Sequence, residues 1–341
     1  MLRQRLAGAI QRLRDNTPGA QRGVAEPKVS IIIPMHGTAR HVERCVRSAM
    51  AQSLTEIEIL CVDDASPDNC TQIVQRLARK DGRIRLIRHD RNRGLGGARN
   101  TGLSVARAPY VGSIDSDDHI LPPMMEHLWQ ASGEGIADVV ACGFRRVHAD
   151  DSGAAPSQRP QPGRFRNDGQ QLNIFEFLTP SFCTKIWKRS LFTEPLITFP
   201  ENTFFEDLAV TPQLIHRARD LRVVDADYYR YFVRPGSISR SFSSKHILDH
   251  FRVFDILHDF LVREDLMERY GQALRERIGR SLAAHAAEVQ ASAMEEEDKR
   301  RYLRTCLMLQ RGYLQLMDQL RDLPTEHLQA GFFAASGEPA C

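Results

Sequence analysis

Three carboxylates crowd together where a short apolar run ends. Asp115, Asp117 and Asp118 directly follow the apolar segment 110–114. Like charges at this spacing repel one another, so the group costs stability unless something positive neutralises it. Carboxylate oxygens suit Mg²⁺ or Mn²⁺, which bind through one or two carboxylates together with substrate phosphates. The alternative is a solvated acidic turn or a helix N-cap, and this stretch alone does not decide between them.

A second acid and a glycine-rich segment add to this chemistry. Asp64 follows the apolar run Ile57–Val62 and could accept the imide N–H of a uracil ring, or equally cap the next helix. The segment 91–102, RNRGLGGARNTG, leads into a predicted helix. Glycines let backbone N–H groups approach a phosphate, and a helix N-terminus favours an anion. Arg99 would add a charge-assisted contact to a diphosphate.

Other common sites do not fit the sequence. The glycines do not form G-x-x-x-x-G-K-[ST], and no G-x-G-x-x-G follows the first predicted strand. A P-loop and a dinucleotide-binding dehydrogenase are therefore disfavoured. The acid pair Glu206-Asp207 begins a predicted helix, where acids usually compensate the helix dipole. Spacing alone makes catalysis the less favoured interpretation of this pair.

Strands and helices alternate through the first half of the chain. The predicted strands are Val29–Ile33 (closed by Pro34), Ile57–Val62, Ile84–Arg88, Tyr110–Ile114 and Asp138–Phe144. The predicted helices are Ala39–Gln52, Asp68–Lys80, Gly97–Ala106 and Pro122–Ala131. This order predicts an α/β fold with a parallel sheet and helices on its faces. Because ligands gather outside the carboxyl ends of such strands, we expect the loops Pro34–Gly37, Asp63–Asp68, His89–Gly97 and Asp115–Asp118 to converge on one crevice.

The second half has a different pattern. Residues 149–170 lack periodicity and predict an exposed loop. A shorter α+β stretch follows, over Phe182–Phe192, Phe204–Ala218 and Leu221–Val233. Helices are predicted from His246 onward, over 265–293 and over 297–321. We therefore expect an N-terminal helix and linker over 1–27, a domain over 28–240 with halves 28–125 and 126–240, a helical region over 241–322, and a disordered tail over 323–341.

Composition narrows the function classes. The 341 residues carry 46 basic and 43 acidic side chains, and the excess of three lies within residues 1–27. The sequence therefore does not predict a broad basic surface of the kind that binds nucleic acids. Residues 1–27 predict a basic helix that either packs on its own domain or lies on an anionic membrane surface. Seven cysteines without a paired C-x-x-C, no signal peptide and no membrane-length apolar run predict a cytoplasmic protein with reduced thiols.

Four motifs together resemble one enzyme family. VSIIIPMHG, ILCVDDASPDN, NRGLGGARNTGL and YVGSIDSDD, in this order, resemble the family 2 glycosyltransferases over about residues 28–125. The resemblance implies the GT-A fold, a Rossmann-like, mostly parallel sheet flanked by helices, here with a C-terminal helical extension. It also implies transfer of a sugar, with inversion, from a nucleotide diphosphate donor, with a UDP-sugar favoured, to a saccharide or lipid-linked acceptor.

The resemblance also assigns roles to single residues. It implies that Asp64 binds the base, that Asp115 lies near the ribose and that Asp117 ligates Mn²⁺ or Mg²⁺. Pro34 and Arg99 complete the implied donor site. His36-Gly37 departs from the family, which often has Tyr or Phe and then Asn at this place.

A second resemblance lies further along the chain. CTKIWKRSLF, ITFPENTFFEDLAV and YYRYFVRPGSIS resemble members that assemble capsule and exopolysaccharide. In these members a Glu-Asp pair supplies the catalytic base, which implies Asp207 of the pair Glu206-Asp207. The Gln-x-x-Arg-Trp motif of processive synthases is absent, since the two tryptophans are Trp129 and Trp187. Transfer of a single sugar is therefore the favoured interpretation.

Two other functions share features with this assignment. A sugar-phosphate nucleotidyltransferase shares the sheet architecture but would carry G-x-G-T-R after the first strand, where IIIPMHGTARH has a single glycine. The other alternative is a catalytically silent protein of the same fold that binds a nucleotide sugar. The intact DSDD and FFED stretches argue against a silent protein.

Overall fold

The computed structural model describes residues 26–148, 156–167, 172–193, 196–233 and 243–321. The predicted N-terminal helix and C-terminal tail lie outside these residues. Two compact units divide the chain, Met1–Tyr270 and Gly271–Cys341. Each unit is described by itself.

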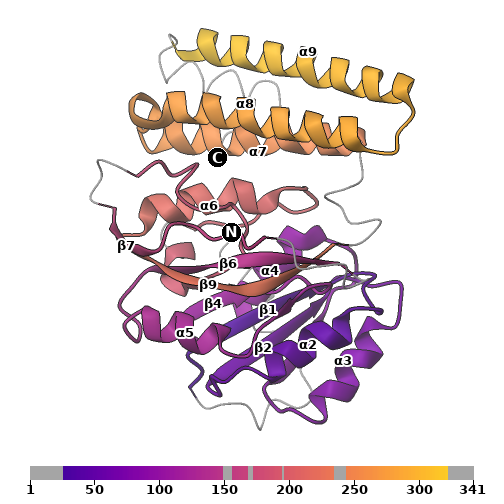
Figure 1. Ribbon diagram of the computed structural model, residues 1–341, viewed down its shortest axis with the longest axis vertical. Coiled ribbons are helices and arrows are strands. Elements are labelled where there is room, and N and C mark those ends of the chain that lie inside the picture. The colour runs from indigo at the N-terminus through magenta and orange to yellow at the C-terminus, as the bar shows by residue number, and fades with distance from the viewer. Residues whose placement is uncertain (1–25, 149–155, 168–171, 194–195, 234–242, 322–341) are drawn as a thin grey trace, which may run out of the picture. The chain divides into compact units, whose positions relative to one another are not determined.

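A single nine-stranded sheet organises the first unit, within the part of the chain that the structure describes (Figure 1). Its strand order is β3-β2-β1-β4-β8-β6-β9-β5, and β7 pairs with β9. β3, β2, β1 and β4 pair in parallel with one another, whereas β8 is antiparallel to both β4 and β6. The strands are β1 (Val29–Met35), β2 (Ile57–Asp63), β3 (Ile84–Arg88), β4 (Tyr110–Ser113), β5 (His119–Ile120), β6 (Val139–His148), β7 (Gly163–Arg166), β8 (Lys185–Lys188) and β9 (Asp220–Val233).

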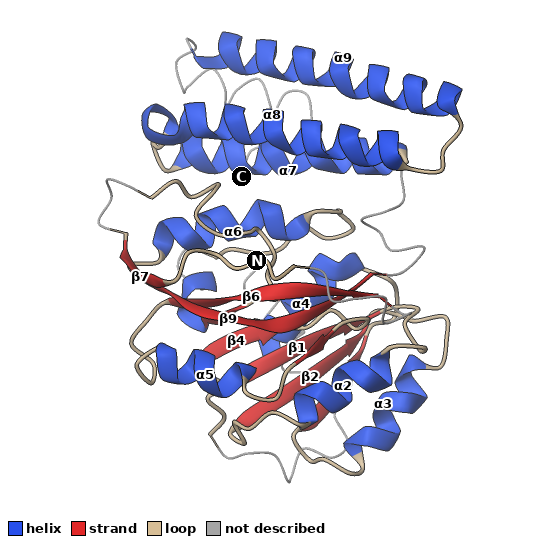
Figure 2. Cartoon of the chain, in the orientation of Figure 1, coloured by secondary structure: helices blue, strands red, loops and turns tan. Residues whose placement is uncertain are grey.

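Helices cover both faces of this sheet (Figure 2). Val29, Ile31 and Ile33 of β1 pack into one core with α2, α3 and α5. Ile32 points to the opposite face, where it meets Gly102 of α4. The helices are α2 (Val42–Met50), α3 (Cys70–Ala78), α4 (Gly94–Val105), α5 (Met124–Ala131), α6 (Glu206–Arg217), α7 (Ser244–Arg263), α8 (Met267–Ala291) and α9 (Glu296–Arg321), with a 3₁₀ turn η1 (Arg189–Phe192).

The predicted α/β architecture is confirmed, and its central strands explain why the sequence shows it. β1 and β2 are buried along their whole length, as parallel strands covered on both faces must be. Pro34 does not close β1 as predicted, because the strand continues to Met35. The neighbouring strand β4 ends opposite Ile32, so a proline two residues later breaks no bond of the ladder on that side.

Two short strands escaped the sequence analysis. β7 lies inside the predicted exposed loop 149–170 and pairs antiparallel with β9. β5 has only two residues, His119 and Ile120, which also pair with β9. Both strands are fixed by β9, more than 50 residues further along the chain, and not by local periodicity. The prediction of a loop was therefore wrong at 163–166, whereas the predicted exposure is confirmed there, since three of the four residues are exposed.

The helical part of the chain follows the predicted pattern. α7 belongs to the first unit, where it packs against α6. In the second unit, the His285 ring of α8 meets the Tyr302 hydroxyl of α9 at 2.8 Å. Within the described residues, none of the helices combines the length and apolar composition that a membrane crossing needs.

Candidate functional site

A cavity of about 430 Å³ lies in the first unit at the carboxyl ends of β1, β2 and β4. Four of its lining residues are acids, namely Asp64, Asp115, Asp117 and Glu206. Pro34 and His36 also line it, as do Asn92 and Gly94 from the start of α4. The predicted convergence of four loops on one crevice is confirmed, and the crevice has the size of a small-molecule site.

The three clustered acids have different surroundings. Asp118 is buried, and its carboxylate accepts hydrogen bonds from the Tyr229 hydroxyl at 2.5 Å and the Phe232 amide at 2.7 Å. Burial, with Asp115 and Asp117 nearby, raises the pKa of Asp118 well above its usual range. Asp118 therefore has a structural place in the site, and Asp115 and Asp117 are the two that line the cavity.

Arg99 links two of the site's acids. Its guanidinium donates to Asp115 Oδ1 at 2.9 Å and to the Glu206 carboxylate, and the side chain is 2% exposed. Burial opposes its charge, but Asp115 and Glu206 raise the pKa of Arg99 above its ordinary value. Arg99 was predicted to contact a diphosphate. Arg99 is not among the described residues that line the cavity, and both of its terminal amino groups are engaged by carboxylates.

The acid pair at the start of α6 is unusually protected from water. Glu206 is buried and lines the cavity, and burial raises its pKa to about 7 although Arg99 opposes the shift. Asp207 is half-buried, and its Oδ1 accepts the Leu208 amide at 2.8 Å. Burial also raises the pKa of Asp207, against the opposing effect of Arg99. Both acids therefore hold a proton more strongly than exposed carboxylates do.

A residue with a strained backbone precedes this acid pair and places it at the site. Phe205, just before α6, has a left-handed backbone with φ of 60°, which is costly for a bulky side chain. Its ring stacks on His250 of α7, with ring centres 4.1 Å apart. The neighbouring Phe204 amide donates to Asp249 Oδ2 at 2.8 Å. α7 therefore holds the conformation that brings Glu206 to the cavity.

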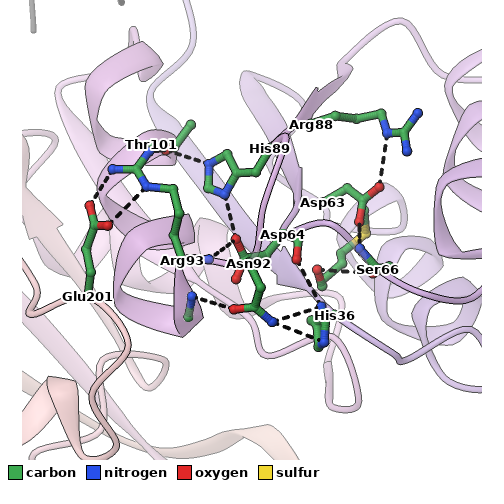
Figure 3. Close-up of polar contacts among 12 residues, drawn as sticks. His36, Asp63, Asp64, Ser66, Arg88, His89, Asn92, Arg93, Thr101 and Glu201 are labelled. Carbon is green, nitrogen blue, oxygen red and sulfur yellow. Dashed lines mark hydrogen bonds and ion pairs between the residues drawn. The ribbon is translucent and has the colours of Figure 1, made fainter.

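Asp64 lies in a dense set of polar contacts (Figure 3). Its Oδ1 accepts the His89 ring N–H at 2.6 Å and the Arg93 amide at 2.9 Å. The other His89 nitrogen lies 2.8 Å from the Thr101 hydroxyl. Asp64 does not cap α3, whose preceding loop uses Asp68 to accept the Cys70 amide at 3.1 Å. The alternative role of Asp64 as a helix cap is therefore excluded.

The glycine-rich segment packs closely against two neighbouring parts of the chain. A Cβ on Gly94 would lie 2.9 Å from the Asn202 nitrogen, and one on Gly96 would lie 2.3 Å from the Pro200 oxygen. A Cβ on Gly102 would lie 2.5 Å from Ile32. These glycines allow the backbone of α4 to lie directly against the segment 199–202 and against β1. Close packing therefore explains the positions of these glycines, and Gly94 also lines the cavity.

Several lining residues were missed from the sequence. His36 Nδ1 donates to the Asp64 carbonyl at 2.9 Å, and the Asn92 amide contacts the same ring at 3.1 Å. Tyr231 of β9 and Lys245 of α7 also line the cavity. Asn92 lies within a motif already noticed. Tyr231 and Lys245 come from elements whose approach to the site depends on tertiary structure, so no local signal marks them.

The donor groups at Asp115 and Asp117 fit a hard divalent cation. Both are carboxylates that face the same cavity, and burial together with their charge raises the pKa of Asp118 beside them. Within the described residues, no cluster of three or more metal-binding side chains is present. Mg²⁺ and Mn²⁺ are commonly held by one or two carboxylates together with phosphates of a substrate. The residues therefore fit such an ion only together with a phosphate-bearing ligand.

Comparisons with known proteins agree with this geometry. Residues 30–194 match the family model described as Glycosyl transferase family 2. The chain is 31% identical over 218 residues to the uncharacterized glycosyltransferase EpsJ of Bacillus subtilis, covering 62% of this chain and 63% of EpsJ. It is 29% identical over 231 residues to the succinoglycan biosynthesis protein ExoO of Rhizobium meliloti, covering 65% of each. The chain thus spans just under two thirds of these relatives.

A solved structure shares the fold. S. aureus TarS 1–349 in complex with UDP-GlcNAc superposes with a TM-score of 0.53 and 22% sequence identity, covering 82% of this chain and 71% of TarS 1–349. The expected GT-A architecture, a mostly parallel sheet with flanking helices, is confirmed by this likeness.

Proposed function

Because residues 30–194 match the family 2 glycosyltransferase model, we propose that this chain belongs to that family and transfers a single sugar, with inversion, from a nucleotide diphosphate donor to an acceptor hydroxyl. The observation that carries the proposal is the meeting of Asp64, Asp115, Asp117 and Glu206 in one cavity. A UDP-sugar is the favoured donor, because the similar fold of TarS is described with UDP-GlcNAc. Assembly of a surface polysaccharide is the favoured process, because ExoO is described as a succinoglycan biosynthesis protein.

The donor's parts find chemically matched groups around the cavity. Asp64 accepts the imide N–H of the base, and Asp115 accepts hydroxyls of the ribose. Pro34 lines the same wall and supplies apolar surface beside the base. Mn²⁺ or Mg²⁺ held by Asp117 would stabilise negative charge on the diphosphate. Arg99 acts on the donor indirectly, by fixing the Asp115 and Glu206 carboxylates.

The transfer itself is a single displacement. The acceptor oxygen attacks the anomeric carbon from the face opposite the diphosphate, forming one C–O bond while the bond to the diphosphate breaks. Asp207 takes the proton of the attacking hydroxyl. Its raised pKa supports this role, since a base is most effective when its pKa lies near the working pH. Asp207 follows the lining residue Glu206, and catalytic contacts often tighten only when substrate is bound.

Asp207→Asn tests the base. Asparagine keeps the shape of the side chain but cannot take a proton, so we expect turnover to fall by about 10²–10⁴-fold. The dissociation constant for UDP should stay unchanged. Donors are first screened by thermal shift with Mn²⁺, and turnover is then followed as release of UDP. Asp225→Asn, the same change at an exposed position, is the matched control.

Each other result has a clear meaning. Full turnover by Asp207→Asn, with loss in Glu206→Gln, would transfer the role of base to Glu206. Tight UDP binding by the wild-type protein without turnover on any donor would favour the catalytically silent alternative.

Removal of metal tests the role of Asp117. We expect EDTA to abolish turnover and Mn²⁺ or Mg²⁺ to restore it, because two carboxylates otherwise face the diphosphate with like charge. Asp117→Ala should lose both turnover and the thermal stabilisation that Mn²⁺ gives in the presence of UDP. Full turnover in EDTA would contradict the metal requirement.

A further inference from the structure

His89 connects the base-binding acid to the interior of the protein. It lies directly after β3, and its amide donates to the Asp63 carbonyl at 2.9 Å. The His89 side chain is 6% exposed and that of Asp64 is 4% exposed. Nothing in the proposed chemistry uses this buried imidazole, and burying a polar ring is costly unless it is hydrogen-bonded.

The partners of His89 fix the direction of each hydrogen bond (Figure 3). Asp64 Oδ1 can only accept, so His89 Nδ1 carries the proton in their 2.6 Å contact. Arg93 donates to the Thr101 hydroxyl oxygen at 3.4 Å, which leaves the hydroxyl proton for His89 Nε2 at 2.8 Å. The arginine, threonine and histidine therefore form one directed relay that ends on Asp64.

This relay determines which oxygen of Asp64 is offered to a ligand. Oδ1 already accepts from His89 and from the Arg93 amide at 2.9 Å. No hydrogen bond from the described residues reaches Oδ2, and Asp64 lines the cavity. A carboxylate with one oxygen doubly engaged has a fixed rotamer, so its second oxygen is presented in one orientation.

We propose that His89 is a positioning residue that sets base specificity, by holding Asp64 so that Oδ2 accepts the imide N–H of a uracil-type base. The inference rests on the proposed function, because it assumes that the cavity takes a nucleotide. Arg93 completes the arrangement, since its side chain also binds Glu201 beside the segment that leads to α6. His89 acts through Asp64 alone and makes no contact with the donor.

Binding of UDP and N3-methyl-UDP to the full-length protein, measured by calorimetry, tests the proposal. The methyl group removes the imide N–H, so the ratio of the two affinities reports the contact with Asp64. We expect His89→Phe to weaken the binding of UDP by roughly tenfold, the scale of one hydrogen bond to a charged group. The affinity for N3-methyl-UDP should change little. His89→Asn retains an N–H donor and should keep most of the discrimination.

A double-mutant cycle and a matched control separate positioning from general damage. In an Asp64→Ala background, His89→Phe should change UDP affinity no further, because the residue through which it acts is gone. Thr71→Val removes a hydroxyl that donates to Asp63, the neighbouring buried acid outside the cavity, and should leave the affinity ratio unchanged. If His89→Phe does not fold, Thr101→Val is measured, with a smaller loss of discrimination expected.

The outcomes test the proposed function and the role of His89 separately. A wild-type protein that does not bind UDP would overturn the proposed function. If the wild-type protein binds UDP but the affinity ratio is unchanged in folded His89→Phe, the role of His89 is overturned and the proposed function stands. The same holds for Thr101→Val if that variant is the one measured. Additive losses in the double-mutant cycle would do the same.

Discussion

Glu206 is the residue at which charge, burial and function meet most closely. It lines the cavity, is 5% exposed and shares Arg99 with Asp115. Removing a carboxylate from water favours its neutral form, whereas the guanidinium favours its charged form. Burial prevails here, because the pKa of Glu206 rises to about 7. The ion pair therefore does not by itself keep Glu206 charged at neutral pH.

This shift predicts a dependence of stability on pH. Folding raises the pKa of Glu206 from 4.5 to about 7, so the folded state binds a proton that the unfolded state releases between these values. The contribution of this residue is fully present below about pH 4.5 and is lost as pH rises toward 7. Its size is at most about 3 kcal/mol. Urea unfolding at pH 5 and pH 8 measures it.

Glu206→Gln should flatten this profile, because glutamine has no proton to exchange. Glu268→Gln, a change at an exposed position of α8, should leave the wild-type profile intact. Equal losses of stability between pH 5 and pH 8 in wild type and Glu206→Gln would contradict the assignment.

Residues of the candidate site could be identified from the sequence more readily than the contacts that each of them makes. Asp64, Asp115 and Asp117 were identified because they follow buried strands and face the same edge of the sheet. The engagement of Arg99 by Glu206, 107 positions away, depends on where α6 lies. The relay from Arg93 to His89 likewise depends on the meeting of β3 and α4. Contacts of this kind are set by tertiary structure and leave no local pattern.

At the scale of elements, the close approach of α4 to the segment 199–202 joins the two ends of the site. Asn100 holds the segment from both sides, donating to the Phe199 carbonyl at 2.8 Å and accepting the Phe199 amide at 2.9 Å. The Asn202 amide donates to the Arg93 carbonyl at 2.9 Å. A displacement of either element therefore moves the base-binding side and the acid pair of α6 relative to one another.

Gly96→Ala tests this packing. The added Cβ would lie 2.3 Å from the Pro200 carbonyl oxygen, so the segment 199–202 or α4 must shift. We expect a loss of about 1–3 kcal/mol in the free energy of unfolding, the usual cost of overpacking, together with weaker UDP binding. Chemical denaturation and calorimetry measure the two effects.

Gly279→Ala is the matched control, because nothing lies within 4 Å of its added Cβ in α8. In a helix interior, this change should stabilise by about 0.5–1 kcal/mol. A Gly96→Ala protein as stable as wild type would show that the close approach of the two backbones is not required.

The order of elements was the most predictable part of the fold. Continuous apolar runs identify β1 and β2, since strands covered on both faces admit few polar residues. β5 and β7 are too short for periodicity, and both exist because β9 offers them a paired edge. The predicted element boundaries therefore held best where burial, and not pairing, determines the structure.

At the scale of the whole molecule, every described residue that lines the cavity lies between Pro34 and Lys245. The first unit therefore contains the complete described site. The basic N-terminal segment 1–25 lies outside the described residues. Its arginines account for the excess positive charge of the chain. This segment is predicted either to pack on its own domain or to lie on an anionic membrane surface.

Deletion of residues 1–24 tests this separation of roles. Lys28, which the deletion keeps, anchors the start of β1. Its side chain donates to the Glu56 carboxylate at 2.7 Å, and its amide donates to the Glu56 carbonyl at 2.7 Å. We therefore expect the shortened protein to fold, to bind UDP with unchanged affinity and to turn over donor at the wild-type rate. Its sedimentation with vesicles containing anionic lipid should fall, because the deletion removes five arginines. Vesicles of neutral lipid are the control, and neither protein should bind them. A shortened protein that fails to fold would show instead that the apolar residues at helical spacing in the predicted N-terminal helix, Leu2, Leu6 and Ile10, belong to the core of the first unit.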